Sequence, residues 1–216
     1  MSQIFRKRTN LLAKISIVLG GATAAGILVL GSVLDQSPYY TRVGVPREQP
    51  IPFSHKHHVG GLGIDCRFCH TSVEDSSFAG IPPTATCMKC HSEVWKDAPM
   101  LEPVRESMRS GKPIEWTRVH DVPDFVYFDH SIHIAKGVSC QTCHGRVDEM
   151  PLMKKENTLF MGWCIECHRN PEKFVGPKEH VFEMGWKADE DQLTMGNKLV
   201  KDYNIKTSIN CSTCHR

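Results

Sequence analysis

The sequence has few of the apolar patterns from which a chain of this length normally builds a core. It has 216 residues, of which 40% are hydrophobic, but much of that content lies in one run near the N-terminus, residues 15–34. Residues 35–216 show neither a persistent apolar–polar alternation nor long helix-periodic apolar segments. We therefore expect a mostly α-helical or irregular fold without a sheet, whose core is filled by something other than side chains.

Several common site motifs are also missing. Gly111-Lys112 follows no phosphate-loop glycine, and Gly60-Gly61-x-Gly63 lacks the strand and the third glycine of a dinucleotide site. No H-E-x-x-H metalloprotease motif occurs. The sequence therefore predicts neither a nucleotide site nor a site of the zinc-protease type.

One motif, C-x-x-C-H, occurs five times. Its copies are residues 66–70 (motif 1), 87–91 (motif 2), 140–144 (motif 3), 164–168 (motif 4) and 211–215 (motif 5). They use all ten cysteines, so none remains for a disulfide, an iron–sulfur cluster or a catalytic thiol. A zinc ribbon needs no histidine after each cysteine pair; with 12 histidines in 216 residues, five chance placements have a probability of about 5 in ten million.

In a protein exported to an oxidising compartment, C-x-x-C-H indicates covalent haem attachment. The two thiols form thioethers with the haem vinyl groups, and the histidine binds the iron from one face. The sequence thus predicts five haem c groups, which would supply the missing core. The attachment residues are Cys66, Cys69, Cys87, Cys90, Cys140, Cys143, Cys164, Cys167, Cys211 and Cys214, and the iron ligands are His70, His91, His144, His168 and His215.

The charge distribution excludes a basic nucleic-acid-binding domain. The formal net charge is +2, but residues 1–34 contain four basic residues and no acidic one, so the rest of the chain is slightly acidic. Each haem adds two propionates and makes that part more acidic still.

The N-terminal region predicts a membrane anchor. Residues 15–34 are 20 residues without a charge, and a helix of that length spans about 30 Å, the thickness of a bilayer core. We interpret residues 1–34 as a basic cytoplasmic end and transmembrane signal anchor, residues 35–52 as a proline-rich linker, and residues 53–216 as a haem domain on the periplasmic side of the inner membrane. A cleaved signal peptide is the alternative, although the run is long for one and no clear A-x-A site follows it.

The haem domain contains a duplicated two-haem module. A Phe-x-His-x-x-His segment precedes both motif 1 and motif 3, and motifs 2 and 4 follow at similar spacing, which gives a repeat of about 75 residues. The modules are residues 53–91 and 128–168, with a truncated third unit at 211–216.

Each iron needs a second axial ligand, and five histidines outside the motifs are candidates. His55 and His58 are spaced i, i+3, as are His130 and His133, so each pair would lie on one side of a helical turn and reach two neighbouring haems. His120 lies between the modules and is our candidate for motif 5, which lacks its own His-x-x-His donor.

Other residues have weaker claims as ligands. A histidine outside such a pattern is more often an ordinary surface or core residue, which is our interpretation of His57 and His180. Met161 is a thioether that could ligate a haem, but a methionine there is more often a packing residue. Short helices are expected around the attachment motifs and at residues 93–96 and 101–109.

The repeated unit resembles the class III multihaem cytochromes. Two segments sharpen the resemblance, namely Trp116-x-x-Val119-His120-x-x-Pro123 with the following Val-Tyr-Phe-x-His-x-x-His, and Met161-Gly162-Trp163 before motif 4. With five motifs and an anchor, the chain is similar to the pentahaem cytochrome c subunit of alternative complex III. The resemblance implies three kinds of partner: an iron–sulfur subunit, integral membrane subunits that bind quinol, and a monohaem cytochrome c.

The function predicted from these features is electron relay from quinol oxidation to a periplasmic acceptor. One alternative is a membrane-anchored quinol dehydrogenase of the NapC/NirT type, which usually has four haems and oxidises quinol itself. A second is a multihaem reductase of nitrite or a similar oxyanion, but the pentahaem enzymes of that kind have a C-x-x-C-K motif, absent from this sequence. A third is an independent haem wire without a surrounding complex.

Overall fold

The computed structural model describes residues 6–189 and 191–215. The chain divides into two compact units, Met1–Arg42 and Val43–Arg216.

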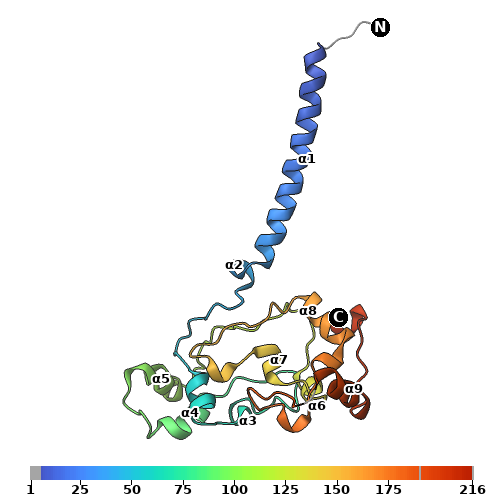
Figure 1. Ribbon diagram of the computed structural model, residues 1–216. Helices are drawn as coiled ribbons and strands as arrows, with labels where there is room; N and C mark the ends of the chain where they lie inside the picture. Colours follow the sequence, from blue (N-terminus) through green and yellow to red (C-terminus); the bar gives the residue numbers. More distant parts are fainter. Residues whose placement is uncertain (1–5, 190, 216) are drawn as a thin grey trace. The chain divides into compact units, whose positions relative to one another are not determined.

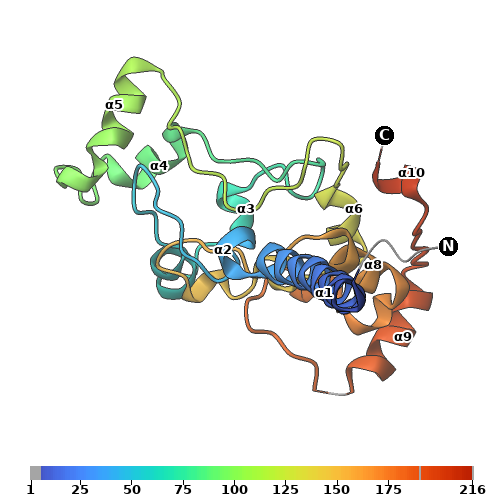
Figure 2. The same cartoon turned by 90° about the horizontal axis from the view of Figure 1, so that it is seen from above.

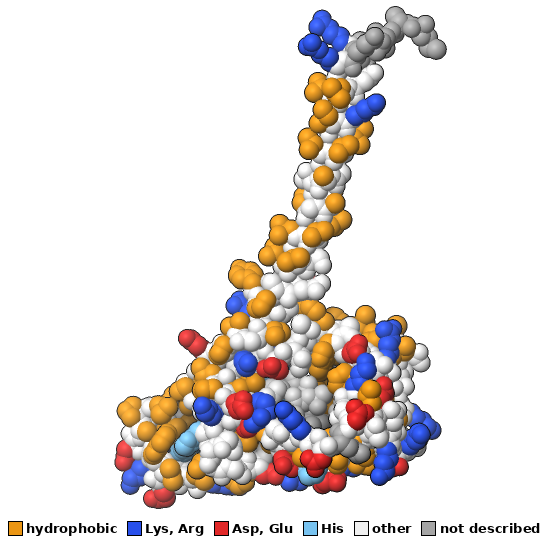
Figure 3. All heavy atoms as spheres, viewed as in Figure 1, with side chains coloured by type: hydrophobic (Ala, Val, Ile, Leu, Met, Phe, Trp, Pro, Cys, Tyr) orange, Lys and Arg blue, Asp and Glu red, His pale blue; other side chains and the backbone are white. Residues whose placement is uncertain are grey.

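The first unit consists of a long helix and a single short turn of helix. Helix α1 (Lys7–Gln36) is about 45 Å long at 1.5 Å per residue, and α2 (Pro38–Thr41) begins after the extended residue Ser37. Apolar side chains cover α1 along its length, with Lys and Arg at its N-terminal end (Figure 3). Among the described residues, Arg8–Gln36 is the one helix long and apolar enough to cross a membrane, with a mean hydropathy of 2.2. A membrane anchor and a signal sequence share these properties.

The second unit is made of short helices joined by irregular segments (Figures 1 and 2). In the described part of the chain, β structure is limited to isolated bridges such as Val43 with Lys155. The expected mostly helical or irregular fold without a sheet is therefore confirmed. The helical segments are η1 (Lys56–Gly61), α3 (Cys66–Cys69), α4 (Thr84–His91), η2 (Pro99–Leu101), α5 (Glu102–Ser110), α6 (His130–Ala135), α7 (Cys140–His144), η3 (Val147–Glu149), α8 (Met161–Arg169), η4 (Pro171–Lys173), η5 (Lys178–His180), α9 (Gln192–Asp202) and α10 (Cys211–Cys214).

The side-chain core is small, as the composition predicts. One cluster joins Ile51 to two residues around α5, and another joins Val175 to two residues of α9. A cavity of about 2590 Å³ is bordered by many segments of the unit, among them Val175 of one cluster and Trp116, which packs against the other. The interior of this unit is therefore mostly a space lined by side chains.

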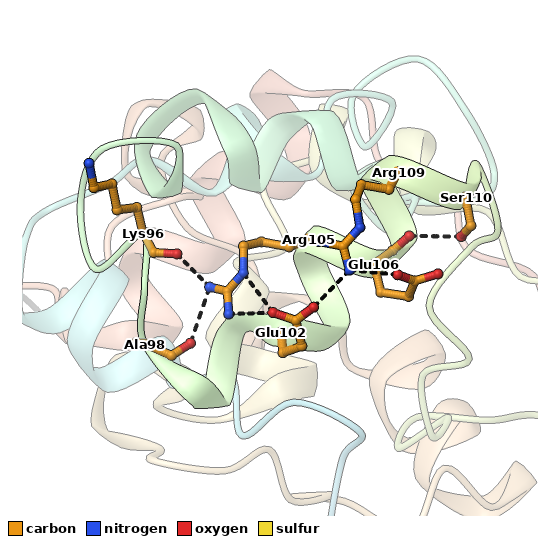
Figure 4. Close-up of polar contacts among 7 residues, drawn as sticks. All are labelled: Lys96, Ala98, Glu102, Arg105, Glu106, Arg109 and Ser110. Carbon is orange, nitrogen blue, oxygen red and sulfur yellow. Dashed lines mark hydrogen bonds and ion pairs between the residues drawn. The ribbon is translucent and has the colours of Figure 1, made fainter.

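Helix α5 forms where the sequence predicts a helix at residues 101–109. Pro103 stands in its first turn, where a missing N–H costs nothing, and Gly111 ends it with a left-handed φ of 70°. The guanidinium group of Arg105 donates to the Glu102 carboxylate at 2.6 Å and to the backbone carbonyl of Lys96, and Arg109 pairs with Glu102 at 2.8 Å (Figure 4). These ion pairs lie within the helix and contribute little individually, whereas the hydrogen bonds from Arg105 to the Lys96 and Ala98 carbonyls tie the helix to the preceding loop.

The prediction of a helix at residues 93–96 is wrong. Those residues form turns, and Trp95 has a φ of 56°, which a helix does not allow. The His91 ring explains the turn, because its Nδ1 donates to the Val94 carbonyl oxygen at 2.9 Å and so holds the chain close to the histidine.

Helix α9 packs closely on the η4 turn. The Asp191 carboxylate caps its N-terminus by accepting a hydrogen bond from the Thr194 backbone N–H at 3.0 Å. A Cβ atom added at Gly196 would overlap the backbone carbonyl of Glu172. Glycine at this position is therefore required for the helix to approach η4.

We expect Gly196→Ala to destabilise the haem domain by about 1–3 kcal/mol, because the helix must move away from η4 to admit a methyl group. Thermal unfolding of the haem-loaded protein, followed by circular dichroism, measures the change. Lys198→Ala, at an exposed position of the same helix, is the control and should unfold at nearly the wild-type temperature. Equal midpoints for the two variants would contradict the packing described here.

Candidate haem sites

All five C-x-x-C-H motifs border the same cavity. Its lining includes the ten cysteines and the five motif histidines, together with the five histidines expected as distal ligands. A pocket that buries one drug-sized molecule has a volume of roughly 300–1,000 Å³, so a cavity of about 2590 Å³ has room for several such groups. The size and the donor set of the cavity both fit multiple haems.

Short helices position the two thiols of each motif. Motifs 1, 3 and 5 begin α3, α7 and α10, whereas motifs 2 and 4 end α4 and α8. On a helical turn, residues spaced i, i+3 lie on one side, so both thiols can reach one porphyrin edge while the next residue, histidine, points to its face. At motif 1 the Asp65 carboxylate fixes the start of the turn by accepting from the backbone N–H of Arg67 at 2.8 Å.

Four motif histidines are oriented by backbone carbonyls. A carbonyl oxygen only accepts, so a ring Nδ1 within hydrogen-bond distance of one carries the proton and leaves the Nε2 lone pair free for a metal. The Nδ1 atoms donate to carbonyl oxygens as follows: His70 to Gly80 at 2.7 Å, His91 to Val94 at 2.9 Å, His168 to Ser208 at 2.9 Å, and His215 to Phe125 at 3.2 Å.

Three of the five candidate distal histidines show the same arrangement. The Nδ1 atoms of His58, His130 and His133 donate to the carbonyl oxygens of Ser54 at 2.9 Å, Ser77 at 2.8 Å and Asp129 at 2.6 Å. The carbonyls that select this tautomer were not predictable, because a backbone carbonyl has no signature in the sequence.

Two histidines have a buried ring nitrogen without a hydrogen-bond partner. They are the Nε2 atom of His120 and the Nδ1 atom of His55. A buried polar atom left unpaired costs about 1–3 kcal/mol, and a bound metal would supply the missing partner at the nitrogen that ligates it. Burial lowers the pKa of both rings to about 4, so both are neutral near pH 7, the form in which imidazole binds iron. Burial likewise lowers the pKa of His144 to about 3.

Three pairs of histidine rings have the separation expected of ligands on opposite faces of one iron. With metal–nitrogen bonds of about 2 Å, the centroids of two such rings lie roughly 6.4 Å apart. The observed separations are 6.2 Å for His58 and His91, 6.1 Å for His133 and His168, and 6.4 Å for His130 and His144.

The two modules repeat this geometry closely. Phe53 stacks on His58 with centroids 4.4 Å apart and meets His55 edge-on at 4.9 Å. Phe128 stacks on His133 at 4.5 Å and meets His130 edge-on at 4.8 Å. His55 is therefore the counterpart of His130, and motif 1 is the motif that it could serve. Burial lowers the pKa of His55, and the next largest cause is His70 of motif 1.

His120 lies against His144, with ring centroids 4.3 Å apart. That separation is too short for the two rings to bind opposite faces of one iron. Among the described residues no ring contact joins His120 to His215, so the assignment of His120 to motif 5 stays a prediction.

The residues with weaker claims are engaged elsewhere. His57 stacks on Trp95 at 5.8 Å, and His180 stacks on Trp186 at 4.8 Å while its Nδ1 meets the Glu183 carboxylate at 2.6 Å. Met161 is 65% exposed at the start of α8. These contacts agree with their interpretation as surface and packing residues.

Paired thiols on helical turns, histidines whose Nδ1 atoms donate to backbone carbonyls and one large apolar-lined cavity define a multihaem c-type cytochrome. Comparison with known proteins identifies the family of the chain. Residues 126–216 match the family described as cytochrome c7 and related cytochrome c. The chain is 37% identical over 145 residues to the menaquinone reductase multiheme cytochrome c subunit of Nitratidesulfovibrio vulgaris, a match that covers 57% of this chain and 69% of the relative.

A second relative is cytochrome c-552 of Porphyromonas gingivalis, 31% identical over 91 residues, which are 37% of this chain and 17% of that protein. The chain therefore belongs to the multihaem cytochrome c family that includes the Nitratidesulfovibrio protein. The predicted attachment of multiple c-type haems is confirmed.

We expect His133→Ala to convert one haem from a low-spin to a high-spin ferric state while every haem stays covalently attached. The substitution removes one candidate axial ligand and leaves all ten cysteines in place. Electron paramagnetic resonance measures the spin states, and intact-protein mass measures the haem content. His57→Ala is the matched control and should leave the spectrum unchanged; an unaltered spectrum in His133→Ala would remove His133 from the ligands.

Proposed function

We propose that the chain is a pentahaem electron-transfer subunit of a membrane-bound, quinone-linked respiratory complex. The observation that carries this proposal is the pairing of histidine rings about 6 Å apart along one cavity. When bound, haem supplies one-electron chemistry between ferric and ferrous iron. Where a histidine binds each face of an iron, no open position is left for a substrate, and three ring pairs have the separation that this requires, which favours a carrier over an enzyme.

The protein's own residues have three tasks in such a carrier. The ten cysteines fix each porphyrin in place, and the ten candidate ligand histidines hold the same coordination in both oxidation states. The surrounding apolar side chains exclude water from the cavity. The attachment sites lie close together, which shortens the distance over which each electron is transferred.

We assign the direction of flow from quinol oxidation to a periplasmic acceptor, by way of an iron–sulfur partner. The resemblance of the His120 segment and of Met161-Gly162-Trp163 to the subunit of alternative complex III supports this assignment. The partners would then be an iron–sulfur subunit, integral membrane quinol-binding subunits and a monohaem cytochrome c.

A second candidate is electron flow toward menaquinone, within a menaquinone-reductase-type complex. The observation that favours it is the 37% identity to the menaquinone reductase subunit. The purified complex distinguishes the two candidates. Reduction of the haems by a quinol supports the first, whereas reduction of menaquinone by a pre-reduced soluble cytochrome, with no haem reduction by quinol, supports the second.

The spin states of the five haems test whether the chain is a carrier. We expect a redox titration of the native complex, followed optically and by electron paramagnetic resonance, to resolve five low-spin, six-coordinate haems in this subunit. Cyanide or nitrite should leave their ferric signals unchanged. A high-spin ferric signal that shifts with either anion would contradict the carrier function and favour an oxyanion reductase.

We further propose that α1 is retained as a single-pass anchor in the inner membrane, with the haem domain on the periplasmic side. The basic residues before the apolar run favour a cytoplasmic N-terminus. Tyr39 and Tyr40 follow directly after α1 and are 81% and 66% exposed, which suits residues at a membrane–water interface.

The mass of the mature protein tests the anchor. We expect the mass of the protein purified from membranes to be that of a chain that keeps the apolar run at residues 15–34, with five haems added, and we expect the protein to resist extraction by alkaline carbonate. A mature N-terminus beyond residue 34, together with release of the haem domain into solution, would show that the helix is a cleaved signal peptide.

A further inference from the structure

Motifs 1 and 3 are in direct contact, although 69 residues separate them in the sequence. The Cys66 and Cys140 side chains adjoin each other. Both motifs also contact one segment, Val181-Phe182. The Cys140 backbone N–H donates to the Val181 carbonyl at 3.2 Å, and the Cys66 Sγ meets the Phe182 carbonyl at 4.0 Å. Val181 is 1% exposed, so this junction lies in the interior of the domain.

Motif 2 adjoins motif 1. The short His55–His58 segment contacts both motifs. The backbone N–H of Ile64, two residues before motif 1, donates to the His58 carbonyl at 3.1 Å, and the His58 ring lies 6.2 Å from the His91 ring of motif 2.

Motif 4 adjoins motif 3 in the corresponding way. Helix α6 again reaches both motifs, since His130 opposes His144 and His133 opposes His168.

Motif 5 adjoins motif 4. Burial, and then the Cys214 thiol, raise the pKa of Cys164. The His168 ring donates to the carbonyl of Ser208, three residues before motif 5.

In these contacts motifs 2 and 5 each have one neighbouring motif, and each also contains an exposed cysteine. Eight of the ten cysteines are partly buried, and the two exposed ones are Cys90 of motif 2 and Cys211 of motif 5. In Figure 2, α4 with motif 2 lies toward one end of the domain, α3 with motif 1 lies centrally, and α10 with motif 5 lies at the other end.

From these contacts we infer that the five haem attachment sites form one unbranched row in the order 2–1–3–4–5, and that electrons enter and leave at its exposed ends, motifs 2 and 5. This inference rests on the proposed carrier function. Each transfer moves one electron, from a one-electron donor docked at one end to a one-electron acceptor docked at the other. The row order holds for either direction of flow.

Cryo-electron microscopy of the native, haem-loaded complex tests the order directly. The four shortest porphyrin edge-to-edge distances should join motifs 2 and 1, 1 and 3, 3 and 4, and 4 and 5. The nearest redox centres of partner subunits should face motif 2 or motif 5. A haem of motif 2 closest to motif 4, or a partner centre facing motif 1, 3 or 4, would overturn the inference.

Two matched variants give an independent test in solution. Cys211→Ala/Cys214→Ala removes attachment at motif 5, and Cys87→Ala/Cys90→Ala removes it at motif 2. Because each end site has one neighbour, each variant should shift the midpoint potential of one remaining haem, that of motif 4 or of motif 1, and leave the other three within error. The haems of motifs 2, 3 and 4 should have distinct ferric signals, because the interplanar angles of their histidine pairs differ, at 67° for His58–His91, 8° for His130–His144 and 50° for His133–His168.

A shift at two or more remaining haems in either end variant would contradict an unbranched row. Failure of the proposed function looks different. A complex that neither oxidises quinol nor reduces menaquinone would refute the quinone-linked role, while the same iron positions would still report the order.

Discussion

The hydrogen bond between a histidine Nδ1 and a backbone carbonyl is the interaction on which the rest of this structure depends. It selects the tautomer whose Nε2 faces the cavity, and it does so with carbonyls that are often distant in the sequence. His215 uses Phe125, 90 residues away, and His168 uses Ser208, 40 residues away. For these two ligands, correct orientation is possible only when distant segments are already in place. Ligand geometry and tertiary structure form together.

The small side-chain core has the same consequence for stability. Two clusters of three buried apolar residues cannot stabilise an irregular chain of this length, because ordering each residue costs about 1–2 kcal/mol of conformational entropy. The cavity is the main site available for further apolar burial. A covalently attached cofactor that also binds two histidines supplies burial and cross-links at once, so the haem domain is expected to fold around its cofactors.

The sequence predicted the chemistry of the sites well and their arrangement poorly. The C-x-x-C-H motifs and the repeated Phe-x-His-x-x-His segments are local patterns, and the matching geometry of Phe53 and Phe128 reflects them. The turn at Trp95 and the position of His120 beside His144 depend on tertiary contacts that no local pattern encodes. The helix expected at residues 93–96 failed for that reason, since one imidazole–carbonyl bond at Val94 outweighs a modest helix propensity.

The contact between Cys66 and Cys140 explains how a duplicated module yields a row that departs from chain order. Both residues are the first cysteine of the first motif in their module, so the modules meet through equivalent positions. Head-to-tail stacking of two copies would give the order 1–2–3–4, whereas contact through equivalent surfaces, as in a two-fold dimer, leaves the second motifs outermost. The order 2–1–3–4 follows, and motif 5 extends the row beyond motif 4. The segment Val181-Phe182, which binds both first motifs, lies outside the repeat and fixes this junction.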